Sequence, residues 1–115
     1  MSSRIVGMKT VTVTVSTAGT AQRIMTTTNA ERYVTDFEVY VPIGNTGTNI
    51  YIGDSTVDNT WIPRAKGVRY NFYHGTGTLL GPGEVTCFDL SKIYIDVDTN
   101  GDQAIIQYFS RVLDT

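Results

Sequence analysis

The stretch Lys9-Thr-Val-Thr-Val-Thr-Val-Ser16 alternates polar and apolar residues without a break. Successive side chains of a β-strand point to opposite faces of the sheet, so Val11, Val13 and Val15 share one face and the threonines share the other. β-Branched side chains also favour extended backbone, because a helix restricts their χ1 rotamers. The stretch therefore predicts a strand with one buried face.

The whole chain shares this bias toward β-branched residues. Thr, Val and Ile account for 40 of the 115 residues, whereas Ala, Leu and Glu account for only 12. This composition favours an all-β protein and excludes a helical bundle, a coiled coil and an α/β nucleotide-binding fold. A chain of this length has room for one domain.

Other segments bounded by Gly, Pro or Asn predict further strands. They cover residues 22–28, 33–41, 49–53, 68–73, 84–90, 93–97 and 104–112. Within 33–41, alternation places Tyr33, Thr35, Phe37, Val39 and Val41 on the core face. Residues 61–67 are expected to be irregular, and Asn100-Gly101 predicts a hairpin turn between the last two strands.

About eight strands at this spacing indicate a single-domain β-sandwich, of which the jelly roll is one form. We expect this domain to cover residues 8–115 and an extended arm to precede it at residues 1–7.

Charge and cysteine content restrict the partners of the chain. The formal net charge of −2 argues against a nucleic-acid partner. The single cysteine, Cys87, excludes an internal disulfide and a cysteine-based zinc site. Apolar runs are too short to span a membrane, and no secretory leader is recognisable at the start. We therefore expect synthesis in a reducing cytoplasm and no membrane partner.

One segment resembles half of a calcium-binding loop. Asp96, Asp98 and Asn100 stand at alternate positions before Gly101, as oxygen ligands do in such loops. The match stops there, because Gln107 occupies the position of the bidentate glutamate and the flanks read as strands. These three residues are metal candidates only, and a plain turn is the competing interpretation. We expect no cofactor.

Catalytic constellations are not recognisable. Neither His74 nor Cys87 lies in a sequence motif that supplies a nucleophile, a base and an orienting group together. Asp96 and Asp98 share one strand face, but ordinary turns also carry such aspartates. We therefore predict that the chain is not an enzyme.

Residues 61–74 combine the only tryptophan with three of the nine basic residues. Binding surfaces are enriched in aromatic residues and arginine. This pattern predicts that part of the segment is an interface. The candidate interface residues in it are Trp61, Arg64, Lys66, Arg69 and Tyr73. In the competing interpretation, alternate members such as Tyr70 and Phe72 belong to the core.

Three motifs occur in order along the chain: Asn49-Ile-Tyr-Ile-Gly-Asp-Ser-Thr-Val57, Leu80-Gly-Pro-Gly-Glu84 and Leu90-Ser-Lys-Ile-Tyr-Ile-Asp-Val-Asp-Thr-Asn-Gly-Asp102. In this order they resemble small β-sandwich virion proteins of tailed bacteriophages, which serve as capsid cement or decoration proteins. The resemblance covers roughly residues 34–112. The chain departs from the pattern at residues 61–78, which separate the first motif from the second.

The resemblance implies a non-enzymatic virion component: a homotrimer on the capsid surface that binds the major capsid protein and bridges capsomers. It also implies that the arm at residues 1–7 reaches an adjacent capsomer, which makes Arg4 a further candidate interface residue. The alternatives are a low-copy tail, neck or fibre-associated protein and a carbohydrate-binding module. In the carbohydrate-binding module, Trp61 and Tyr73 would stack on sugar rings.

Overall fold

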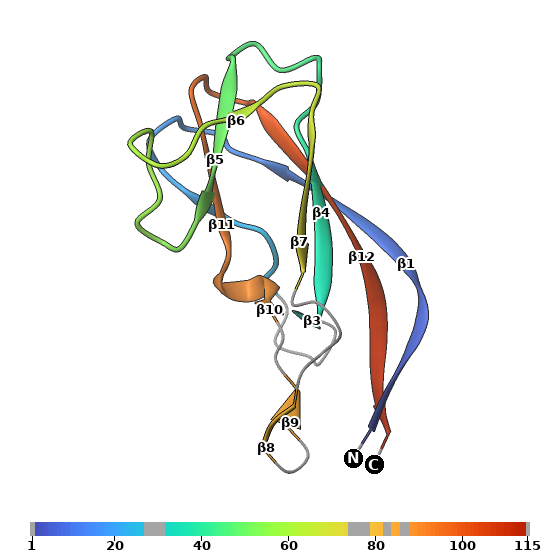
Figure 1. Ribbon diagram of the computed structural model, residues 1–115. Helices are drawn as coiled ribbons and strands as arrows, with labels where there is room; N and C mark the ends of the chain where they lie inside the picture. Colours follow the sequence, from blue (N-terminus) through green and yellow to red (C-terminus); the bar gives the residue numbers. More distant parts are fainter. Residues whose placement is uncertain (1, 27–31, 74–78, 82–83, 86–87, 115) are drawn as a thin grey trace.

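The computed structural model describes residues 2–26, 32–73, 79–81, 84–85 and 88–114 (Figure 1). The elements in chain order are β1 (Ser2–Thr14), β2 (Gln22–Arg23), β3 (Tyr33–Val34), β4 (Asp36–Tyr40), β5 (Asn49–Gly53), β6 (Arg64–Ala65), β7 (Arg69–Tyr73), β8 (Leu79–Gly81), β9 (Glu84–Val85), β10 (Phe88–Asp89), the 3₁₀ helix η2 (Leu90–Lys92), β11 (Tyr94–Val97) and β12 (Gln103–Asp114). The chain is all-β, as its composition predicts.

Two four-stranded antiparallel sheets form the body of a β-sandwich. The first has the order β1-β12-β4-β7, and the second has the order β2-β11-β5-β6. The first of these eight strands thus pairs with the eighth, the second with the seventh, the third with the sixth and the fourth with the fifth. A long antiparallel ribbon rolled up in this way is a jelly roll.

One apolar cluster fills the space between the two sheets. The first sheet contributes Val13, Phe37, Val39, Ala104 and Ile106, and the second contributes Ile50, Ile95 and Val97, all of which are buried. The alternation of β1 explains the contribution of that strand. Val11 lies opposite Ile106 and Val13 lies opposite Ala104, on the face that meets the second sheet. The threonines of β1 accordingly point to the solvent side.

Strand β1 is longer than the alternating stretch alone predicts. It begins at Ser2, so the backbone of the expected arm is extended over residues 2–7 and pairs with β12. The next strand, β4, pairs with β12 only over residues 105–108. Residues 2–8 and 109–114 therefore form a two-stranded ribbon that leaves the sandwich body and ends at the two termini (Figure 1). We call this segment the terminal ribbon.

The predicted strand at 33–41 is divided. Val34 is buried and Tyr33 is exposed, the reverse of the predicted faces, whereas Phe37, Val39 and Val41 are buried as predicted. The cause is a break at Thr35, where the chain leaves the small β3–β10 sheet and enters β4. The break shifts the alternation by one residue, and a shift of one exchanges the two faces.

Residues 61–67 are irregular as predicted, except that Arg64–Ala65 form β6, an edge strand of the second sheet. Two other predictions about single elements were wrong. Residues 84–90 contain two short strands, β9 and β10, that belong to neither main sheet. The turn at Asn100-Gly101 has the expected positive φ, 87° at Gly101, yet it is not a hairpin. It carries the chain from β11 in one sheet to β12 in the other.

Candidate functional site

The turns that precede Trp61 hold it against the second sheet. Asp54 and Asp58 each accept hydrogen bonds from the amide and hydroxyl of a threonine two residues later, so two similar turns follow one another. These hydrogen bonds lower the pKa of both carboxyl groups. The indole of Trp61 then lies on Gly53 of β5, where a Cβ atom would come within 2.4 Å of the ring. Trp61 is still 38% exposed.

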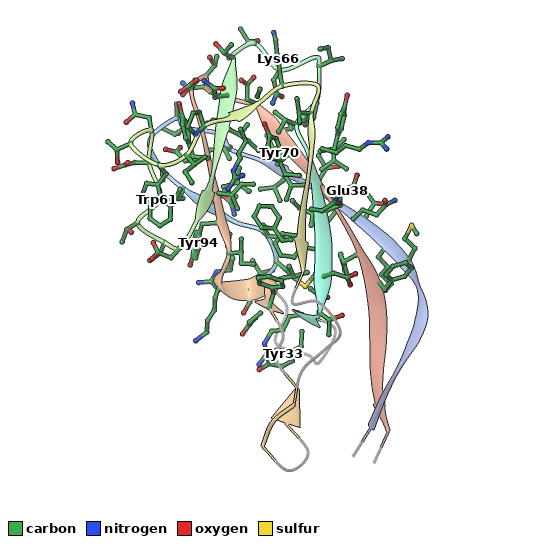
Figure 2. All side chains as sticks on the ribbon, in the orientation of Figure 1. Tyr33, Glu38, Trp61, Lys66, Tyr70 and Tyr94 are labelled. Carbon is green, nitrogen blue, oxygen red and sulfur yellow. The ribbon has the colours of Figure 1, made fainter. Side chains whose placement is uncertain are left out.

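Arg64 points inward from β6. It lies opposite Ile50, which is fully buried, so the two side chains share the inner face of the sheet. Its guanidinium lies 5.2 Å from the ring centre of Tyr70 and 5.4 Å from that of Phe72. The hydroxyl of Tyr70 also accepts a hydrogen bond from the Ala65 amide. Arg64 and Tyr70 thus close the side of the sandwich between β6 and β7, and Figure 2 shows Tyr70 between the two sheets.

The remaining candidates of the predicted interface are dispersed. The Lys66 ammonium group donates to the backbone oxygen of Asn45 at 3.2 Å, at the loop end of the sandwich (Figure 2). Arg69 lies on the outer face of the first sheet, where its Nε is 3.6 Å from Glu38 Oε1. Tyr73 pairs through its backbone with Asp36, and Arg4 pairs with Val112 in the terminal ribbon. The side chains of Tyr73 and Arg4 lie outside the described residues, as do His74 and Cys87.

The calcium-loop candidates serve as hydrogen-bond acceptors for neighbouring loops. Asp96 Oδ1 accepts from the Gly19 amide at 2.9 Å, and Asn100 Oδ1 accepts from the Ala18 amide at 2.8 Å. Asp98 Oδ1 accepts from the Tyr51 hydroxyl at 2.7 Å. No group of three or more His, Cys, Asp or Glu side chains in the described part of the chain could hold a metal ion.

Two further residues, which the sequence did not single out, complete this arrangement. Asp102 accepts hydrogen bonds from the amides of Thr46 and Gly47, at 2.9 and 2.8 Å. The side chain of Asn45 accepts from the Gln103 amide and donates to the Gln103 carbonyl, as a paired strand would. We call the set Asn45, Asp96, Asn100 and Asp102 the loop clasp. It joins three loops at the end of the sandwich opposite the terminal ribbon (Figure 1).

The hydrogen bond to Asp98 also alters the acidity of Tyr51. It raises the pKa of the Tyr51 hydroxyl from its ordinary value of 10.0 to about 12, and burial and the nearby carboxyl charges add to the effect. Only the neutral tyrosine can donate this hydrogen bond, so the hydrogen bond is present in the folded protein at neutral pH.

A different surface lies where the terminal ribbon leaves the sandwich. Met8 and Phe109 are opposite each other across β1 and β12, and they are 58% and 39% exposed. They border a shallow cavity of about 370 Å³ on the outer face of the first sheet, which Asp36, Glu38 and Gln107 also line. The sequence did carry a signal for Met8, which follows the alternation of the exposed threonines but is apolar.

Comparison with models of protein families, with curated proteins and with solved structures gave no match. Within the described ranges, no helix has the length and apolar character needed to cross a membrane.

Proposed function

We propose that the chain is a non-enzymatic structural protein of a bacteriophage virion, a capsid cement or decoration protein that binds the outer shell and bridges capsomers. The terminal ribbon is the single observation that carries this proposal. The motif order of the sequence supports it, and the jelly-roll order agrees with it at the level of fold, because capsid domains are among the proteins built on this order.

The terminal ribbon has no third strand in the described part of the chain. A two-stranded ribbon alone is at best marginally stable in water, because it has no third strand and no core to cover it. Residues 2–8 and 109–114 pair only with each other among the described residues. The adjacent Met8 and Phe109 add apolar surface at the ribbon's base. In the proposed role, this ribbon lies on the shell, and the exposed apolar side chains at its base contact the shell protein.

Copy number tests the virion role directly. The amount of this chain relative to the major shell protein would be measured by quantitative mass spectrometry of purified particles. We expect hundreds of copies in a simple ratio to the shell protein, since a cement protein occupies every equivalent lattice position. A dozen copies or fewer would favour a tail or neck protein, and absence from the particle would overturn the proposal.

The ribbon's part in binding has its own test. The double variant Met8→Thr, Phe109→Thr removes the apolar pair and keeps residues that favour strands. We expect it to bind shells prepared without this protein more weakly than the unmodified chain. Ile43→Thr is the matched control, because Ile43 is 69% exposed but lies in the loops at the other end. Equal binding by both variants would show that the ribbon's base does not contact the shell.

A further inference from the structure

Among the residues that the structure describes, strand β1 pairs along one edge only. It is the outermost strand of the first sheet, and this paired edge faces β12. Beyond its other side, between β1 and residues 22–26, lies an open groove of about 450 Å³. An unpaired strand edge carries peptide groups that a further strand can satisfy.

The hydrogen bonds of Val15 identify the groups. Its amide donates to the Asp102 carbonyl, and its carbonyl accepts from the Gly101 amide, so both groups point toward β12. The peptide groups of a strand alternate in direction from one residue to the next. Those of Val11 and Val13 therefore also point toward β12, whereas those of Thr10, Thr12 and Thr14 point into the groove. The side chains of these three threonines are exposed.

The segment Thr10-Val-Thr-Val-Thr14 reads the same in both directions around Thr12. Two copies related by a two-fold axis place antiparallel strands against each other. With the axis at Thr12, that residue meets its own symmetry mate and Thr10 meets Thr14 of the other copy. Each of these facing pairs then exchanges two backbone hydrogen bonds, because all of the paired residues direct their peptide groups to the same edge.

Charge and side-chain chemistry favour the same pairing. Lys9 is the only charged residue between Met8 and Ser16. In the two-fold arrangement the two Lys9 residues stand six positions apart, about 20 Å along the strand. The facing threonines form cross-strand pairs on the outer face, and valines continue the inner face across the junction. The edge also lacks the proline, charge or bulge with which proteins usually block such pairing between residues 10 and 14.

We propose that the chain forms a two-fold dimer by antiparallel pairing of β1 with β1 of a second copy, centred on Thr12. The first sheets of the two copies join into one continuous eight-stranded sheet. This inference does not depend on the virion role, and it replaces the homotrimer that the sequence resemblance implies.

The test uses charge at the residue on the axis. Thr12→Lys and Thr12→Glu each place two like charges against each other, whereas a mixture of the two variants places opposite charges there. We expect the unmodified chain to sediment as a dimer at micromolar concentration, each variant to weaken the dimer by about tenfold or more, and the mixture to restore it. Because Thr12 is exposed, these changes leave the core intact, and circular dichroism verifies the fold.

Asn59→Lys is the matched control. It adds the same charge at an exposed loop position away from β1 and is expected to leave the dimer unchanged. Cross-linking then checks the register. Thr12→Cys is expected to form a disulfide with its own copy, and Thr14→Cys only with Thr10→Cys, with the linked peptides identified by mass spectrometry. A monomer at all concentrations, a trimer, or a dimer that Thr12→Lys does not weaken would overturn the proposal.

Discussion

The two ends of the sandwich are held by different kinds of interaction. At the loop end, the clasp residues Asn45, Asp96 and Asp102 are the buried polar side chains of the described chain, and each is hydrogen-bonded to the backbone of a distant segment. At the other end, the two strands of the terminal ribbon pair with each other through their backbones, and Met8 and Phe109 are exposed at the base of the ribbon. The loop end is thus stabilised by buried hydrogen bonds, whereas the base of the terminal ribbon presents exposed apolar side chains for binding.

This difference has an energetic basis. A buried acceptor that is removed leaves its donors without partners, and each such loss costs about 1–3 kcal/mol. An exposed apolar side chain contributes little to folding, because it is exposed in the unfolded chain as well. Substitutions at the two ends should therefore separate stability from binding, and three predictions test this separation.

The largest effect is expected at Asp102. Asp102→Ala removes a buried acceptor and leaves the half-buried amides of Thr46 and Gly47 without this partner, so we expect the free energy of unfolding to fall by about 2 kcal/mol. Chemical denaturation followed by Trp61 fluorescence measures this. Asp102→Asn keeps one acceptor oxygen and should lose about half as much. A loss below about 1 kcal/mol for the alanine variant would mean that the clasp does not fix the loop end.

A smaller and pH-dependent effect is expected at Tyr51. Its pKa is raised to about 12 in the folded chain, and an unfolded tyrosine titrates near 10. The folded state therefore holds the proton more tightly, so this contribution is complete below about pH 10 and is lost as the pH rises from 10 toward 12.

Comparison with a variant isolates this contribution from other titrating groups. Tyr51→Phe should cost about 1 kcal/mol at pH 8, and the difference from the unmodified chain should shrink by pH 11. Denaturation curves of both proteins at the two pH values measure it. A difference that is independent of pH would contradict a role for the Tyr51–Asp98 hydrogen bond in stability.

The smallest effect on stability is expected at the terminal ribbon. The double variant Met8→Thr, Phe109→Thr should lower the free energy of unfolding by less than about 1 kcal/mol, because Met8 is 58% and Phe109 is 39% exposed and threonine keeps the β-branched preference for strands. The same denaturation assay applies. If the loss exceeded about 1.5 kcal/mol, the ribbon's base would belong to the folded core, and the contrast between the two ends would be lost.

Local patterns in the sequence predicted much of the fold. The alternation of Val11, Val13 and Val15 identified a long strand and its buried face, and residues 49–53 were predicted with the correct bounds. The strand order was not predictable, because it depends on pairings between distant segments. The break at Thr35 was missed for the same reason, since only the partners of Tyr33–Val34 and Asp36–Tyr40 show that they lie in different sheets.

The candidate site was harder to predict than the fold. Arginine is a residue type that binding surfaces favour, which made Arg64 a candidate. Its cross-strand partner, Ile50, shows that it lies on the inner face, and this pairing cannot be read from the local sequence. Asp96 and Asn100 have the spacing of cation ligands, yet their oxygens accept hydrogen bonds from the amides of Gly19 and Ala18, which are 77 and 82 residues away in the sequence. Residue types revealed hydrogen-bonding capacity, and only the tertiary fold determined the partner.

The pairing of β1 with β12 also governs when the protein can fold. These strands come from opposite parts of the chain, so the first sheet cannot form around its centre until β12 has been synthesised. Proteins dominated by such distant contacts fold slowly. During synthesis, both edges of β1 therefore stay unpaired until β12 has been made. Unpaired strand edges make such an intermediate prone to aggregation. The threonines on the outer face of β1 keep one side of this unpaired strand polar.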